Sequence, residues 1–369
     1  MRIGIDTTPL LGRMTGVGVY TSNLLKVLAQ DWTEDELVAT AFTWRGRHGL
    51  HSAIPPRVCV RSRPAPARAL REMWSAVGFP PVEALCGPVD AFHATNFVLP
   101  PLRRAAGIVT VHDVAFLRYP ETVSAASLAY RELVPAGLSR AAMVLTPSQA
   151  VAEQVQDAYA VPDDRIMVTP LGVDPQWSVT PPPPPVWRSA RGISADYVLA
   201  VGTLEPRKNL RTLVAAYAGL VAGRADVPPL VIAGGSGWGE ALDLSTIPDG
   251  RVILTGHLPL PDLRSLVAGA TLLVFPSIDE GFGLPSLEAL ACGVPVVAND
   301  LPVMREVLGD QADFCDAVDP LALADAILTV LENPRGSADA RRARAAEFSW
   351  TRCAKLTHAA YEAAVALRR

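Results

Sequence analysis

Two apolar runs that enclose a glycine-bent loop and one short helix constrain the fold of this chain more than any other feature. The first run, Leu272–Phe275, precedes the segment PSIDEGFGLPSLEALACGVPVVAN, and the second, Val294–Val297, lies near its end; both are typical of interior strands in a parallel sheet. Pro285 suits the first turn of a helix, and Gly293 is placed to end it. The loop Asp279–Gly283 is therefore expected at the carboxyl ends of the strands, where ligands bind in open α/β sheets.

This loop has the residues of an anion site. Gly281 and Gly283 let the main chain come close to a ligand. The amides of Gly283, Leu284 and Ser286 are expected to point at the ligand from the start of the helix. Because helix starts carry partial positive charge, this end attracts anions such as phosphate.

Two carboxylates, Glu280 and Glu288, flank the same turn, and neither would help to bind a phosphate. An ionised carboxylate accepts two hydrogen bonds from a vicinal diol, as on a ribose or a hexose. Main-chain amides that bind phosphate, next to carboxylates that bind diols, are the features expected of a nucleotide-sugar site. The alternative is that Glu288 only favours the positive end of its helix and Glu280 is a solvated loop charge.

A basic pair, Arg207 and Lys208, follows an expected strand in LEPRKNL and precedes a helix expected over 209–220. There the guanidinium and the ammonium could neutralise two phosphates together. The alternative is a basic pair in a solvated turn. The sequence contains neither an Asp-x-Asp triplet nor a histidine cluster, so we expect no metal and no cofactor.

Two further candidates lie in the first half of the chain. His112 and Asp113 end an expected strand over 108–112 at a carboxyl edge, although a lone histidine is usually structural and Asp113 could simply fold a turn. Gly16 and Gly18 lie in a turn between a strand and a helix. This turn is similar to a dinucleotide fingerprint, but G-x-G alone is weak evidence and the acidic partner on the next strand is missing.

Composition excludes several classes of protein. The 369 residues, half of them apolar and 19% charged, suit two domains with sizeable cores. A net charge of −4 argues against a general nucleic-acid binder. No apolar run of about 20 residues is present, and the start MRIGIDTTPL is strand-like, so we expect a cytoplasmic location. The five cysteines have no C-x-x-C pair and are expected to be small buried residues.

Both halves alternate short apolar strands with helical patterns, which predicts two doubly wound α/β domains. Five prolines, Pro181–Pro185, are expected to form a stiff connector between them. The sequence therefore predicts an N-terminal domain over 1–180 and a C-terminal domain over 181–349. A final helix over 350–369 is predicted from the spacing of Cys353, Leu356 and Ala360. The expected strands are 2–6, 37–42, 91–93, 108–112, 143–146 and 165–168 in the first half, and 197–201, 230–233, 252–254, 271–275 and 294–297 in the second.

Motifs along most of the chain resemble those of the retaining glycosyltransferases of family 4, also called group 1 glycosyltransferases, and of mannosyltransferases among them. These motifs are TGVGVYTSNLL, VHD, VTPLGVD, VGTLEPRKNL and EGFGLPSLEA. The resemblance implies the GT-B fold, in which two Rossmann-like doubly wound domains face an interdomain cleft. It also implies an N-terminal acceptor domain, completed by the final helix, and a C-terminal domain that binds the nucleotide sugar.

The resemblance further implies roles for residues of this chain. In similar enzymes the matching histidine faces the transferred sugar, the basic pair contacts the phosphates, and the two carboxylates bind sugar and ribose hydroxyls rather than forming a covalent adduct. The departing phosphate is thought to take the proton of the acceptor. The implied catalytic residues are His112, Arg207, Lys208 and Glu280. The implied nucleotide-sugar contacts are Gly16, Gly18, Arg207, Lys208, Glu280, Gly281, Phe282, Gly283, Leu284 and Glu288.

The donor and acceptor stay open at this stage. GDP-mannose is the first expectation, with UDP- or dTDP-sugars as alternatives, and the acceptor is a glycan, a lipid-linked molecule or a small molecule. The segment Arg45–Arg71 carries seven arginines and an amphipathic stretch that could contact an anionic membrane at its inner face, but surface arginines explain it equally well. Competing functions are a nucleotide-sugar epimerase or phosphorylase, a nicotinamide-dependent dehydrogenase and a non-catalytic nucleotide-sugar-binding protein.

Overall fold

The computed structural model describes every residue except 13, 45–48, 65 and 369, and it divides the chain into two compact units. Unit 1 comprises Met1–Leu117, Ala125–Gly172 and Ser349–Arg369, and unit 2 comprises Arg118–Ser124 and Val173–Phe348. Arg45, where the predicted basic segment starts, and Arg369, where the predicted final helix ends, lie outside the described residues.

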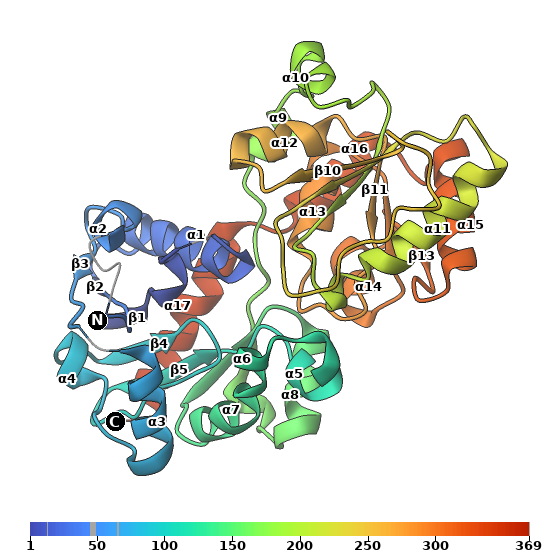
Figure 1. Cartoon of the computed structure of the whole chain (residues 1–369). Coiled ribbons are helices and arrows are strands. Elements are labelled where there is room, and N and C mark those ends of the chain that lie inside the picture. Colours follow the sequence, from blue (N-terminus) through green and yellow to red (C-terminus); the bar gives the residue numbers. More distant parts are fainter. Residues whose placement is uncertain (13, 45–48, 65, 369) are drawn as a thin grey trace. The chain divides into compact units, whose positions relative to one another are not determined.

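Unit 1 contains a seven-stranded parallel sheet in the order β3-β2-β1-β4-β5-β6-β7, which confirms an α/β architecture (Figure 1). The six strands expected from the sequence are present with small shifts of their ends, and β3 was not predicted. β3 has two residues at the edge of the sheet, too few to leave an alternating pattern. The strands are β1 Arg2–Asp6, β2 Glu36–Thr40, β3 Cys59–Val60, β4 Ala91–Ala94, β5 Ala106–Thr110, β6 Met143–Thr146 and β7 Ile166–Val168.

The longer helices of unit 1 are α1 Gly16–Asp31, α3 Ala67–Val77, α7 Tyr130–Leu138, α8 Gln149–Tyr159 and α17 Trp350–Ala366. The short helical segments of unit 1 are η1 Thr8–Leu10, α2 Leu50–Ala53, α4 Glu83–Cys86, α6 Ala125–Leu128 and η4 Asp163–Arg165. α5 Ala115–Arg118 begins in unit 1 and ends on the first residue of unit 2, and η3 Pro120–Thr122 lies in unit 2. α17 comes from the end of the chain and packs against α1 and against the middle of this sheet (Figure 1). Ser349 begins α17 by accepting a hydrogen bond from the amide of Arg352, and the face with Cys353, Ala360 and Ala364 is buried.

Unit 2 contains a six-stranded parallel sheet in the order β10-β9-β8-β11-β12-β13. Its strands are β8 Val198–Val201, β9 Leu230–Ala233, β10 Val252–Gly256, β11 Leu272–Phe275, β12 Val296–Asn299 and β13 Asp313–Cys315. Its helices are α9 Gln176–Val179, α10 Pro185–Ser189, η5 Pro206–Lys208, α11 Leu210–Gly223, α12 Leu260–Ala268, α13 Leu284–Cys292, α14 Pro302–Leu308, α15 Pro320–Glu332 and α16 Ala338–Ala346.

Three details of unit 2 differ from the sequence-based expectation. β12 begins at Val296 rather than Val294, because the amide of Val294 donates to Ala289 at the end of α13 and so continues the helix end. The edge strand β13 was not predicted. The proline run lies inside unit 2, where Pro185 begins α10 with a backbone angle suited to a first helical turn, and the two units meet in sequence at Gly172 and Val173.

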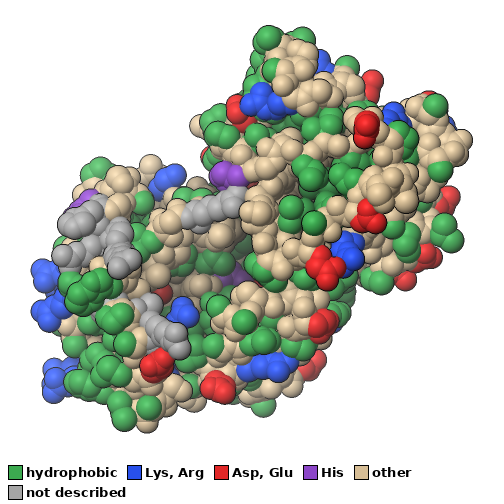
Figure 2. All heavy atoms as spheres, in the orientation of Figure 1, with side chains coloured by type: hydrophobic (Ala, Val, Ile, Leu, Met, Phe, Trp, Pro, Cys, Tyr) green, Lys and Arg blue, Asp and Glu red, His purple; other side chains and the backbone are tan. Residues whose placement is uncertain are grey.

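Three further features of the structure relate to the expectations drawn from composition: the surface charges, the lengths of the helices and the burial of the cysteines. Acidic and basic side chains are interspersed on the visible face of unit 2 (Figure 2). Among the described helices, none has both the length and the apolarity that a membrane span needs. Of the five cysteines, Cys86, Cys292 and Cys353 are buried as expected, whereas Cys59 and Cys315 are only partly buried.

Candidate functional site

Two loops at the carboxyl edge of the unit 2 sheet are tied together by hydrogen bonds. One follows β8 and holds η5, and the other joins β11 to α13. The amide of Ile278 donates to the carbonyl of Arg207 at 3.0 Å, and the guanidinium of Arg207 donates to the carbonyl of Asp279 at 3.2 Å. The side chain of Asn209 adds a bond to the carbonyl of Pro276 at 3.1 Å. The basic pair and the acidic loop, distant in sequence, are thus held at one place.

At this place Lys208, Glu280 and Arg207 form a partly buried charge cluster. Nζ of Lys208 lies 2.5 Å from Oε1 of Glu280, and a terminal nitrogen of Arg207 lies 3.7 Å from Oε2. The exposed fractions of the three side chains are 14%, 9% and 19%. The alternatives of a solvated turn and a solvated loop charge are therefore wrong.

Glu280 is ionised in this cluster. Burial by itself raises the pKa of its carboxyl, but the charges of Lys208 and Arg207 outweigh that effect and hold the pKa below 4.5. Because an ammonium group has three N–H donors, Lys208 can bind Glu280 and still donate to a ligand oxygen. Lys208 can therefore donate to a ligand while its ion pair with Glu280 stays intact.

The start of α13 adds main-chain donors beside the charge cluster. Gly283 precedes the helix with φ of 84°, a left-handed conformation that residues with a side chain rarely adopt, so this position favours glycine. The amide of Ser286 donates to the carbonyl of Gly283 at 3.1 Å. The prediction that Ser286 offers a free amide is therefore wrong, because the first turn closes on itself. Helix geometry leaves the amides of Gly283 and Leu284 at the helix start.

Phe282 and Gly281 lie in the same loop with different surroundings. The ring of Phe282 is buried and packs edge-on against Phe348, with centroids 5.7 Å apart. Its side chain therefore serves the core of unit 2, and only its main chain is suited to contact a ligand. Gly281 is buried in the same turn, where a side chain would have to be accommodated in packed surroundings.

Glu288 lies on the second turn of α13 in a different electrostatic setting. Burial raises the pKa of its carboxyl to about 8; the charge of Arg264 partly opposes this rise, and Asp174 adds to it. Arg264 is itself paired with Asp174 at 2.9 Å. The expectation of an ionised diol acceptor needs correction, because near pH 7 this carboxyl is mainly protonated. A protonated carboxyl donates one hydrogen bond and accepts another, which still suits a diol.

We predict a pH effect on stability that Glu288→Gln removes. The folded chain holds the Glu288 proton up to about pH 8, whereas an unfolded glutamate loses it near pH 4.5. The stabilising contribution is therefore complete below about pH 4.5 and is lost as the pH rises through about 8. The melting temperature of the wild type should fall by a few degrees more than that of Glu288→Gln between about pH 5 and pH 9. Glu34→Gln, at an exposed position, is the control, and equal pH profiles for all three proteins would refute this assignment.

In unit 1, His112 lies two residues after β5 and is 8% exposed. Its Nε2 is 2.8 Å from the carbonyl oxygen of Thr95, so Nε2 carries the proton and Nδ1 is the acceptor. Burial lowers the pKa of His112 below 6.5, with small opposing effects of Thr95 and Asp113, and the ring is neutral at pH 7. Asp113 folds the following turn by accepting a bond from the amide of Ala115 at 3.1 Å.

A buried network of hydrogen-bonded side chains lies next to His112 in unit 1. The hydroxyl of Tyr361 meets Nδ1 of His93 at 2.7 Å, Nε2 of His93 meets Thr110 at 2.7 Å, and Thr110 meets Tyr20 at 3.0 Å. The Tyr20 ring packs edge-on against His112, with centroids 5.1 Å apart. This network links α17 and α1 to the sheet and holds in place the Tyr20 ring, against which His112 packs.

The two predicted glycines of α1 differ in their surroundings. Gly16 is exposed at the first position of the helix, and among the described residues nothing lies within 4 Å of a Cβ built there. Gly18 is buried, and its Cβ would lie 2.9 Å from the carbonyl oxygen of Pro9. Gly16 therefore has room to approach a ligand, whereas Gly18 has a packing reason to be glycine.

Sequence reasoning missed Asp6, which ends β1 at the carboxyl edge of the unit 1 sheet. It is 6% exposed and accepts bonds from the amide and the hydroxyl of Thr8 at 2.9 and 2.6 Å. Burial raises its pKa to about 6, against the lowering effect of those bonds. The available signal was an acidic residue directly after an apolar strand in MRIGID.

Comparison with known proteins identifies the class. Residues 188–348 match the family described as glycosyl transferases group 1, and residues 14–177 match glycosyltransferase family 4. The chain is 34% identical over 281 residues to O-antigen chain mannosyltransferase B of Escherichia coli, covering 73% of this chain and 74% of that protein. The chain therefore belongs to the group 1, family 4 glycosyltransferases, and it is a glycosyltransferase, as the motifs predicted.

One further relative and one solved structure of similar fold span nearly the whole chain. D-inositol 3-phosphate glycosyltransferase of Paenarthrobacter aurescens (strain TC1) is 27% identical over 98% of this chain and 97% of its own length. The solved structure of sucrose-phosphate synthase from Thermosynechococcus elongatus has a TM-score of 0.73 at 20% identity and covers 98% of each chain. The latter likeness and the two parallel sheets establish the GT-B fold.

Proposed function

We propose that this glycosyltransferase moves a hexose from a nucleoside-diphosphate sugar to an acceptor with retention of configuration and without a metal ion. The observation that carries the proposal is the partly buried cluster of Lys208, Arg207 and Glu280 beside the start of α13. Two cations and main-chain amides at one point suit a diphosphate leaving group. Fixed cations can supply the charge that a divalent ion supplies elsewhere.

In this proposal each predicted residue has one task. Arg207, Lys208 and the amides of Gly283 and Leu284 bind the diphosphate, Glu288 binds the ribose and Glu280 binds a sugar hydroxyl. Since Nζ of Lys208 already engages Oε1 of Glu280, we assign this carboxylate a binding role and no covalent one. The bond between C1 and the phosphate oxygen breaks, the acceptor oxygen bonds to C1 on the same face, and the departing phosphate takes the acceptor proton.

Unit 1 is proposed to bind the acceptor, which is a glycan, a lipid-linked molecule or a small molecule. Nδ1 of His112 accepts a hydrogen bond from a hydroxyl of the transferred sugar, for which a neutral ring is required. Gly16 has space for close approach of a ligand, and Gly18 keeps the turn compact. Together these features favour an enzyme over a non-catalytic nucleotide-sugar-binding protein, which would have no need for His112.

GDP-mannose is the proposed donor, and UDP- or dTDP-linked glucose or rhamnose is the alternative. A relative at 34% identity is named as a mannosyltransferase of O-antigen chains, which supports mannose and polysaccharide assembly. A thermal-shift comparison of GDP, UDP, dTDP and ADP tests the base, because a bound ligand raises the melting temperature. We expect the largest rise with GDP.

Transfer from GDP-mannose in the presence of EDTA tests the remaining parts of the proposal. We expect turnover to persist. We also expect the NMR coupling constants of the product to show the same anomeric configuration as in the donor. Loss of turnover that Mg²⁺ or Mn²⁺ restores, or an inverted product, would contradict metal independence or retention respectively.

A peripheral membrane contact through the basic segment of unit 1 is also proposed. In α3, Leu70 and Trp74 are buried, whereas Met73 and Val77 are 41% and 70% exposed, and Phe79 just beyond is 60% exposed. Apolar side chains left in water beside arginines suit the surface of an anionic membrane. Flotation with phosphatidylglycerol vesicles should carry the wild type but not Val77→Asp, and failure of the wild type to float would remove the proposal.

A further inference from the structure

An arginine-lined pocket lies at the opposite edge of the unit 1 sheet from His112. It has a volume of about 810 Å³, which is within the usual range of small-molecule sites. Arg2 begins β1, Asp90 precedes β4, and Arg103 and Arg104 precede β5, so the pocket opens at the amino ends of the strands. None of the residues discussed for glycosyl transfer lines it.

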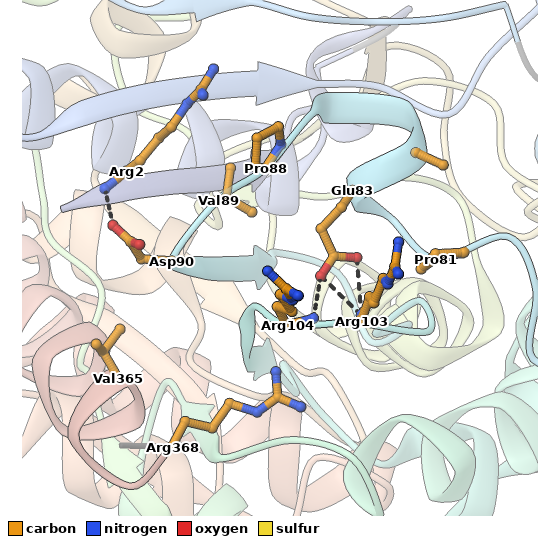
Figure 3. Close-up of a pocket in the computed structure, with 11 residues that line it drawn as sticks. Arg2, Pro81, Glu83, Pro88, Val89, Asp90, Arg103, Arg104, Val365 and Arg368 are labelled. Atoms are coloured by element: carbon orange, nitrogen blue, oxygen red, sulfur yellow. Dashed lines mark hydrogen bonds between the residues drawn. The ribbon is translucent and has the colours of Figure 1, made fainter.

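The charges of the pocket are unbalanced in favour of cations. Four arginines line it, Arg2, Arg103, Arg104 and Arg368, against two carboxylates, Glu83 and Asp90. Figure 3 shows Arg103 and Arg104 beside Glu83 and the side chain of Arg368 extending from the end of α17.

Both carboxylates are already engaged by the main chain. Glu83 accepts bonds from the amides of Arg103, Arg104 and Ala105 at 2.8 to 3.1 Å. Burial alone would raise the pKa of Glu83, but these bonds lower it. Asp90 accepts a bond from the amide of Arg2 at 2.7 Å. The acidic groups therefore shape the pocket instead of pairing with its guanidinium groups.

Two of the four guanidinium groups have local partners. Arg2 pairs with Glu36 at 3.3 Å, and Arg368 donates to the carbonyl of Ala105. For Arg103 and Arg104, which are neighbours and exposed, no side-chain ion pair is found within the part of the chain that the structure describes. Two adjacent forked donors are suited to the oxygens of a phosphate group.

We propose that this pocket binds a soluble phosphorylated small molecule. Its phosphate oxygens accept hydrogen bonds from Arg103 and Arg104, and Arg368 adds charge from α17. Pro81, Ala84, Pro88 and Val89 give the pocket an apolar side for the rest of the ligand. The hollow shape favours a small ligand over a flat membrane surface.

Hydrogen–deuterium exchange of the full chain with inorganic pyrophosphate tests the site. The probe also suits the cluster in unit 2, so the two sites are separated by the peptides that become protected. We expect protection over residues 81–90 and 103–106 as well as around 205–210. In Arg103→Ala/Arg104→Ala the first protection should vanish and the second should remain, with basal glycosyl transfer unchanged.

A charge-matched variant and a lipid arm complete the test. Lys26→Ala/Arg63→Ala removes two exposed cations of unit 1 elsewhere and should keep both protections. By calorimetry, the phase of pyrophosphate binding that belongs to this pocket should lose at least about tenfold in affinity when Arg103 and Arg104 are replaced. Absence of protection over 81–90 and 103–106, or its persistence in that variant, would overturn the proposal. The proposal would also be overturned if the protein bound phosphatidylglycerol vesicles through these arginines while pyrophosphate gave no protection of the pocket.

Discussion

Lys208→Ala should reduce kcat/KM by about 10²- to 10³-fold, the usual effect of removing one preorganised charge from a transition state. Lys208 is placed at the proposed diphosphate, and unit 2, all of whose residues the structure describes, contains no other lysine that could replace it. Steady-state transfer from GDP-mannose measures the loss. Lys355→Ala, at an exposed position of α17, is the matched control and should retain full activity.

The same variant should also lower stability by about 3 kcal/mol, because it leaves Glu280 buried with only the more distant Arg207 as a counter-charge. Removing both charges in Lys208→Ala/Glu280→Ala should restore part of the stability but none of the activity. Chemical denaturation and transfer assays on the three proteins separate the two effects. Recovery of turnover in the double variant would show that the cluster serves the fold alone.

His112→Ala should lower kcat by about 10²-fold or more, with a smaller change in nucleotide affinity, if Nδ1 contacts the transferred sugar. His112→Asn should recover part of the rate, because its amide can place an acceptor near the position of Nδ1. His51→Ala, an exposed histidine of α2, is the control.

The pH profile adds a second test of His112. Since burial holds the pKa of His112 below 6.5, the ring stays neutral at pH 7, and lowering the pH from about 8 to 7 should not reduce turnover on its account. If His112→Ala and His112→Asn kept the wild-type rate, the histidine would be structural.

The strands of both sheets could be predicted because each buried parallel strand leaves a continuous apolar run, as in Leu272–Phe275 and Leu230–Ala233. The short edge strands β3 and β13 could not, since Cys59–Val60 and Asp313–Cys315 leave no such run, whereas the equally short edge strand β7 is apolar throughout and was predicted. The end of β5 was placed too late by two residues, because Val111 and His112 remain buried after the strand pairing stops.

The structure brings together Arg207, Lys208 and Glu280, which the sequence assigned to one site, but the electrostatics there could not be predicted. Motif spacing placed Glu280 and Glu288 in one site, yet their pKa values move in opposite directions. Lys208 lies against Glu280 and lowers its pKa, whereas burial dominates at Glu288 and raises its pKa. The difference between the two pKa values therefore depends on neighbours that are distant in sequence, such as Lys208 and Arg264. The use of the Ser286 amide inside the first turn of α13 was hidden for a similar reason, because one local hydrogen bond decides it.

A crystal structure of the chain with GDP, grown with EDTA, tests the central claim most directly. The account predicts both phosphates within about 3 Å of Lys208, Arg207 or the amides of Gly283 and Leu284, and the ribose hydroxyls on Glu288. A nucleotide bound away from Glu288, or bound only when a divalent ion bridges its phosphates, would contradict it.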